Sequence, residues 1–200
     1  MKILYWLSIT LITGWLISCT MFSPVPVDSQ NKYVLNTLPH VQVKKSQRRM
    51  TLSVARPDSR APYRTKQIAY STQPYQIAYF AKNSWVSYPA EMLHALMIQS
   101  LQNTHYFHAV IGPSMSGEYD YSLNTQLESL LQDYTHRPGM LRLTVRAEIV
   151  RVSTNKIIAT KQFVITEPIA QPSPYSGVTA ANRATAEMLQ QLTQFCLNTI

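Results

Sequence analysis

The chain has 200 residues, with 18 lysines and arginines against 10 acidic residues and a formal net charge of +8. This length suits one domain plus a tether, and two cysteines are too few for a disulfide-rich scaffold. The basic excess would suit anionic lipid headgroups or an acidic partner. Nucleic acid is not an expected partner, because no recognition motif is present and the chain begins with an export signal.

The first 18 residues predict a signal peptide. Lys2 is followed by the largely apolar run Ile3–Ile17, and a charge, an apolar run and a small residue at the cut are typical of a secretory signal. The sequence Leu-Ile-Ser-Cys at 16–19 matches the lipobox of bacterial lipoproteins. The alternative, an uncleaved membrane anchor, needs about 20 apolar residues. We therefore expect Cys19 to be lipidated and, because Thr20 rather than Asp follows it, to anchor the protein at the periplasmic face of the outer membrane.

The sequence after the signal divides into a tether and a domain. Residues 19–31 have no periodicity and contain Pro24 and Pro26, which predicts a lipidated N-terminus on a flexible tether. The single domain is expected over residues 32–200. If Cys19 carries the lipid, Cys196 is left alone, and we expect it to be a buried apolar residue.

The first half of the domain alternates short strands with one helix. Strands are expected over 32–38, 50–55 and 107–111. The basic segment 41–49 between the first two is expected to be a solvated loop or an exposed edge, with membrane-surface contact as the alternative. Residues 67–85 predict a β-hairpin that turns at Gln73-Pro74. Pro89 and Glu91 favour a helix start, and the apolar stripe that follows predicts a helix to about Asn103.

The second half predicts a three-stranded antiparallel meander and a final helix. In the first strand one face is expected to comprise Tyr121, Leu123, Thr125, Leu127, Ser129 and Leu131, and the other Asn124, Gln126, Glu128 and Gln132. The second strand of the meander is expected over 141–149, with its odd-numbered residues pointing inward. The third is expected over 157–166. A helix over about 178–198 completes an α/β (α+β) sandwich, with a mostly antiparallel sheet and two helices packed on one face.

Motifs for catalysis are missing from the sequence. The chain has five glycines, no phosphate-binding loop and no Gly-x-Ser-x-Gly elbow. The close pair His105 and His108 has no neighbouring carboxylate or thiolate, so we expect no metal there. A catalytic triad assembled from distant residues would need no local motif, but the balance predicts no enzyme activity, no cofactor and no metal.

Aromatic residues concentrate in one stretch, which is the candidate contact site. Tyr75, Tyr79, Phe80 and Trp85 are the residues that we expect to meet a partner or lipid, because Tyr and Trp offer a large contact area at little entropic cost. The alternative is that they form the core of the sheet. Strand alternation places Tyr79 and Phe80 on opposite faces, so both alternatives stay open.

The same stretch resembles the ABC-type transport auxiliary lipoprotein family. The resemblance rests on an Ile-x-Tyr strand at 68–70, Pro-Tyr at 74–75, the aromatic pair at 79–80, Trp85, and the Pro-x-Glu helix start at 89–91. It continues through the Phe-x-x-Val strand at 107–110 and covers roughly residues 32–198. Two departures are visible, since Phe80 stands where a second Tyr is common and Asn155 where the family often has a turn Gly.

The resemblance implies a partner role in lipid transport between the envelope membranes. Such lipoproteins accompany an MCE-domain protein, a permease and an ATPase, and the family allows a homo-oligomer. This chain would be their non-catalytic auxiliary subunit. The alternative is an envelope lipoprotein that acts as an activator or pilot subunit of a secretion or cell-wall machine.

Overall fold

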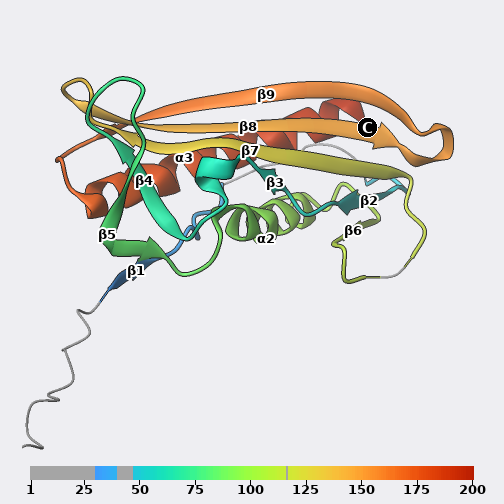
Figure 1. Cartoon of the computed structure of the whole chain (residues 1–200). Helices are drawn as coiled ribbons and strands as arrows, with labels where there is room; N and C mark the ends of the chain where they lie inside the picture. The colour runs from blue at the N-terminus through green and yellow to red at the C-terminus, as the bar shows by residue number, and fades with distance from the viewer. Residues whose placement is uncertain (1–29, 40–46, 116) are drawn as a thin grey trace, which may run out of the picture.

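The computed structural model describes residues 30–39, 47–115 and 117–200, and its longest strands form the predicted meander. Strand β7 (Tyr121–Asp133) pairs antiparallel with β8 (Gly139–Arg151), which pairs antiparallel with β9 (Lys156–Ile169). The β8–β9 connection turns through Asn155, whose φ of 48° lies in the left-handed region that asparagine tolerates. The three strands form the upper layer in Figure 1.

The other edge of β7 is paired by three short strands in succession, and all three run parallel to it. The sheet is therefore mixed, with long antiparallel ladders and short parallel ones. The hairpin of β4 and β5 is antiparallel as predicted, whereas β1 and β6 extend the sheet by parallel pairing with β5 and β2. The short strands are β1 (Asn31–Tyr33), β2 (Thr51–Val54), β3 (Asp58–Ser59), β4 (Gln67–Ser71), β5 (Ala78–Trp85) and β6 (Ala109–Ile111).

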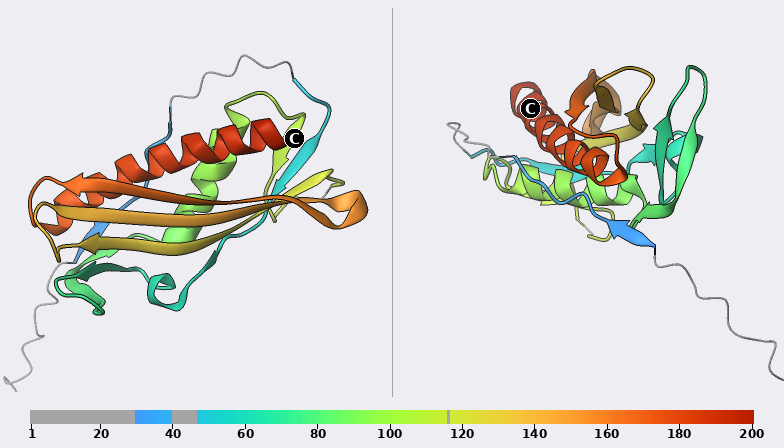
Figure 2. Two further views of the ribbon diagram at one scale, coloured as in Figure 1. Left: turned by 90° about the horizontal axis from the view of Figure 1, so that it is seen from above. Right: turned by 90° about the vertical axis from the view of Figure 1, so that its left-hand side faces the viewer.

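Two helices cover one face of the sheet, which confirms the α+β prediction (Figure 2). Helix α2 (Pro89–Gln102) begins at the predicted proline. Helix α3 (Pro174–Thr199) begins four residues before the predicted start, because the Ser173 side chain accepts a hydrogen bond from the Ser176 N–H and caps the helix. The helices pack on each other through a hydrogen bond between the hydroxyls of Ser100 and Thr193, 2.9 Å apart.

The core lies between this helical layer and the sheet. The predicted inward residues of β8 are all buried. On α3, the side chains of Ala181, Ala184, Met188 and Leu192 are buried as well. Phe195 is half-buried and meets Phe163 edge-on at 6.0 Å between ring centroids. Cys196 is completely buried as predicted, and this burial raises the pKa of its thiol to about 12.

The alternation predicted for the first long strand is wrong beyond Leu127. A β-bulge shifts the β7–β8 register between Leu127 and Ser129, and an extra residue moves every later side chain to the opposite face. Leu130 and Gln132 therefore point into the core, and Leu131 is only partly buried. Sequence alternation by itself gives no sign of the bulge.

The N-terminal predictions are met in part. The strand predicted over 32–38 is reduced to Asn31–Tyr33, and the chain beyond it lies along α3, where Asn182 Nδ2 donates to the Val34 carbonyl at 3.0 Å. The predicted signal peptide, Cys19 and most of the tether lie outside the described residues, as do residues 41–46 of the basic segment. Of the remainder of that segment, Arg48 donates its N–H to the Tyr106 carbonyl at 2.7 Å.

Replacing Gly177 by alanine tests how closely α3 approaches β7. A Cβ at Gly177 would lie 2.0 Å from Gln132 Cδ, so the Gln132 side chain would have to leave its buried position, where its Oε1 accepts a hydrogen bond from the Tyr134 hydroxyl at 2.8 Å. Gly→Ala in an exposed helix stabilises by about 1 kcal/mol, whereas here we expect a loss of about 1–3 kcal/mol from overpacking, measured by urea unfolding. Adding Gln132→Ala should recover part of that loss in a double-mutant cycle. A single variant as stable as the parent would contradict this packing.

Candidate functional site

The loop of the β4–β5 hairpin carries the most exposed aromatic residue of the described chain. We call residues 72–77 the hairpin tip. Tyr75 is fully exposed and has a φ of +66°, a left-handed conformation that is uncommon for a bulky residue. Ile77 beside it is 40% exposed. Tyr75 therefore belongs to the turn rather than to a strand, and the tip presents an aromatic and an aliphatic side chain to solvent.

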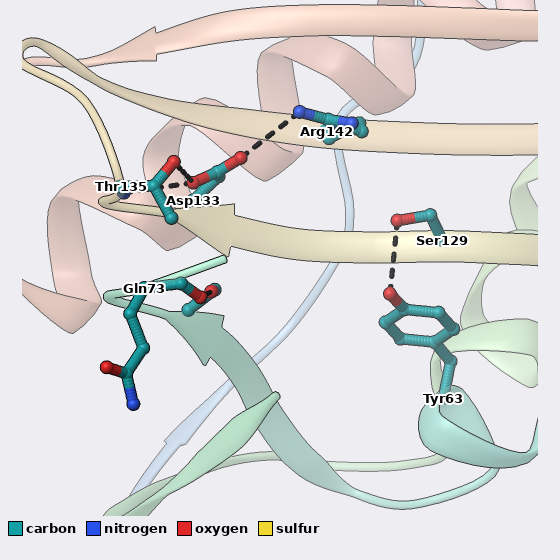
Figure 3. A network of polar contacts seen from close by, with 7 residues as sticks. Tyr63, Gln73, Ser129, Asp133, Thr135 and Arg142 are labelled. Carbon is teal, nitrogen blue, oxygen red and sulfur yellow. Dashed lines mark hydrogen bonds and ion pairs between the residues drawn. The ribbon is translucent and has the colours of Figure 1, made fainter. Parts of the chain in front are cut away.

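A polar network fixes the base of the tip (Figure 3). The Ser71 hydroxyl donates to the Gln73 carbonyl at 2.8 Å, and the Tyr134 N–H donates to the Ser71 carbonyl at 2.8 Å. Ser71 also stands opposite Asp133 in the parallel ladder of β4 and β7. The loop is thus attached to the end of the central strand, which gives the tip a fixed direction.

Asp133 joins this network to β8. Its carboxylate accepts from the Thr135 hydroxyl at 2.6 Å and N–H at 3.0 Å, and Arg142 lies 3.1 Å away. Partial burial opposes ionisation, but these hydrogen bonds and the charges of Arg142 and His136 outweigh it, so the pKa of Asp133 is lowered from its ordinary value. The carboxylate is charged at neutral pH and holds the β7–β8 turn beside the hairpin.

The structure separates the four residues predicted to make contacts. Tyr79 and Phe80 point to opposite faces, as predicted: the Tyr79 hydroxyl donates to the Pro62 carbonyl at 2.9 Å, whereas Phe80 stacks on Tyr70 with ring centroids 4.3 Å apart. Both are half-buried.

Trp85 is part of the core, at 3% exposure, so its ring is not available at the surface. Its backbone is held between two segments, since its N–H donates to the Lys66 carbonyl at 2.7 Å and Tyr33 pairs with it across the β1–β5 ladder. Of the four predicted residues only Tyr75 is fully exposed, and Ile77, which was not among them, is exposed beside it on the tip.

A buried carboxylate that sequence reasoning missed lies on the sheet face opposite the helices. Glu128 occupies the bulge of β7, with Arg146 at 2.9 Å and Arg60 at 3.4 Å, and it accepts a hydrogen bond from the Gln162 amide. Because two arginines and an amide occupy its oxygens, this carboxylate joins β7 to β8, β9 and the segment after β3. Its neighbours satisfy the charge that burial would otherwise make costly.

Titratable groups elsewhere in the described ranges do not gather into a site. No cluster of three or more His, Cys, Asp or Glu side chains in these ranges is arranged to hold a metal ion. His94 uses its Nε2 to contact the Val54 carbonyl at 2.9 Å, a contact between α2 and β2. Neither described helix combines the length and hydropathy that a membrane-crossing helix needs.

Comparison with known proteins identifies the family. The model of the ABC-type transport auxiliary lipoprotein component family matches residues 33–193. The chain belongs to this family. The resemblance noted from the aromatic stretch is thereby confirmed, and family membership places the protein among the membrane-anchored lipoproteins of the cell envelope that serve transporters.

Solved structures agree on the fold. The crystal structure of protein XCC0632 from Xanthomonas campestris is similar, with a TM-score of 0.78 at 16% identity over 84% of this chain and 96% of that one. A second crystal structure, of a protein described only as uncharacterized, has a TM-score of 0.68 at 12% identity over 84% and 99%. A search of curated proteins finds no match. At such identities the likeness concerns the fold alone.

Truncating Tyr75 and Trp85 separately tests the division between exposed tip and core. Tyr75→Ala removes a fully exposed ring, so we expect the free energy of unfolding to change by less than about 0.5 kcal/mol. Trp85→Ala leaves a cavity in the core and should cost about 3–5 kcal/mol. Urea unfolding of both variants measures the difference. Comparable losses for the two would show that the tip packs against the domain.

Proposed function

We propose that this auxiliary lipoprotein is a non-catalytic subunit of an MCE/ABC-type lipid transport system and that acylated Cys19 holds it at the periplasmic face of the outer membrane. The family match over residues 33–193 carries the proposal. The lipobox and Thr20 support the anchor and its address. The use of Glu128 in ion pairs supports a structural rather than catalytic role for the buried carboxylate.

We assign the partner contact to the hairpin tip. Tyr75 and Ile77 combine exposed apolar area with a loop whose base is fixed by hydrogen bonds, so docking would order few additional groups. Aromatic anchors of this kind dominate the energy of many interfaces. The proposed occupant is the MCE-domain protein, which would bring the permease and the ATPase into the same assembly. A second copy of the chain is the other occupant that the tip would suit.

Replacing Cys19 tests the anchor. In cells, Cys19→Ala should abolish labelling by a palmitate analogue and release the protein from membranes, since the acyl chains supply the membrane affinity. The matched control is Cys196→Ala, which removes the second cysteine of the chain and should leave labelling unchanged. Equal labelling of the Cys19→Ala variant and the parent would contradict lipidation at this position.

Truncating the tip tests the contact. In the lipidated full chain, Tyr75→Ala combined with Ile77→Ala should weaken the affinity for the MCE-domain protein by about 30-fold, which corresponds to the roughly 2 kcal/mol of a hot spot. Co-purification of the MCE-domain protein with this variant should fall accordingly. Tyr119→Ala is the control. Tyr119 is 40% exposed, as Ile77 is, but it lies just before the first residue of β7, whereas the tip is attached beside the last residue of β7.

The proteins recovered decide between the alternatives. Equal recovery by the tip variant and the Tyr119→Ala variant would move the interface elsewhere. Loss of self-association instead of MCE recovery would assign the tip to a second copy. Recovery of a secretion or cell-wall machine by the parent would overturn the transport assignment in favour of a pilot or activator role.

A further inference from the structure

The described chain enters the domain at one edge of the sheet. Gln30 leads directly into β1, which pairs with β5 in parallel register from Asn31 opposite Asn83 to Tyr33 opposite Trp85. Cys19 stands 11 positions before Gln30 (30 − 19), and a chain of that length spans at most about 40 Å. If Cys19 is lipidated, the β1 edge therefore lies within that distance of the membrane.

Exposed apolar side chains gather around this entry point. We call Val34, Val86, Tyr88 and Tyr175 the entry patch, and their exposures are 42%, 46%, 42% and 68%. The residues of the patch come from three separate segments of the chain: the residue after β1, the connection between β5 and α2, and the start of α3. The Val86 N–H donates to the Tyr33 carbonyl at 2.8 Å, and the Tyr175 ring lies 6.4 Å from the Tyr33 ring. The start of α3 and the segment between β5 and α2 thus both border β1.

Basic side chains accompany the patch. Lys66 places its Nζ 5.5 Å from the centroid of the Tyr88 ring, and Lys32 is exposed on β1 itself. The neighbouring acid, Glu91, is hydrogen-bonded to the Ser87 hydroxyl. Tyrosines beside small apolar residues and lysines suit the boundary between lipid headgroups and acyl chains, where an amphipathic ring and a cation both find partners.

We infer that the entry patch rests in the headgroup region of the membrane to which the protein is anchored, so that the domain is oriented on the bilayer rather than suspended from it. The inference rests on the proposed lipidation at Cys19. The hairpin tip lies at the other end of β5, a strand of eight residues or about 27 Å (Figure 1). With the patch on the membrane, β5 points the tip away from the lipid surface and toward a partner.

Site-specific fluorescence on the lipidated full chain tests this orientation. Val86→Cys reports on the patch, and Val152→Cys is the matched control, because Val152 is 42% exposed and lies beyond the far end of β8. Lipidation would occupy Cys19, and Cys196 is fully buried, so each variant offers one accessible thiol for a polarity-sensitive fluorophore such as NBD. The proteins are placed in phosphatidylethanolamine–phosphatidylglycerol vesicles that contain lipid with a spin label near the headgroup.

The label at Val86 should emit at shorter wavelength than the label at Val152 and should be quenched several-fold more strongly. Tyr175→Cys provides a second reporter, from a different segment of the patch, with the same expectation. Flotation of the vesicles tests the lipid anchor separately from the orientation of the domain. A chain that does not float with the vesicles overturns the anchor and, with it, this inference. A chain that floats, but whose labels at positions 86, 152 and 175 all show the emission of a fluorophore in water, overturns the orientation alone.

Discussion

The fold depends on the pairing of β7 along both of its edges. One edge is occupied by β8 over its whole length, and the other by β2, β3 and β4 in succession. A buried strand cannot leave its N–H and C=O groups unpaired without a large free-energy cost. The positions of β2, β3 and β4 are therefore set by their pairing with β7, and the loops that follow these strands carry surface features. The hairpin tip and the segment after β3 are two such features.

The bulge at Glu128 shows how one extra residue changes the distribution of chemistry over the sheet. Before it, the buried side chains of β7 are those of Leu123, Thr125 and Leu127; beyond it, Leu130 and Gln132 point into the core. The register shift leaves Glu128 buried between Arg60 and Arg146, and it also turns Gln132 toward Gly177, where α3 has no Cβ to oppose it. The ion pairs of Glu128 and the close approach of Gln132 to Gly177 thus both involve β7 side chains whose direction the bulge sets.

The two exposed apolar surfaces sit at opposite ends of β5 and suit different tasks. The hairpin tip is a short loop held from below by Ser71 and Asp133, which favours recognition of one specific partner. The entry patch is broader, comes from three segments and includes lysines, which favours a lipid surface with no fixed geometry. A protein with both surfaces would connect a membrane to a transporter component by its shape and its chemistry, with no reacting group involved.

The predictions from sequence were good where a local pattern carries the physics. Alternation over residues 141–149 predicted β8 and its inward face, because a strand buried on one side repeats every second residue. The strand predicted over 157–166 lies within β9. The proline and the apolar stripe gave α2, and the aromatic stretch gave the hairpin and the family. The parallel pairing of β2, β3 and β4 with β7 was not predictable in this way, because these strands are too short to show a period. Their partner residues also lie as far as 69 positions along the chain, as for Leu52 and Tyr121 (121 − 52).

The sequence by itself thus determined the kinds of elements, their order, the family and the aromatic stretch in which contacts were to be sought. The tertiary structure decided which aromatic residues are exposed. Tyr75, Tyr79, Phe80 and Trp85 are similar in kind and close in sequence, yet one is fully exposed, two are half-buried and one is in the core. The physical reason is that exposure depends on what packs against a side chain from elsewhere: the Trp85 side chain belongs to the buried core cluster, whereas Tyr75 lies in a turn and its side chain is fully exposed.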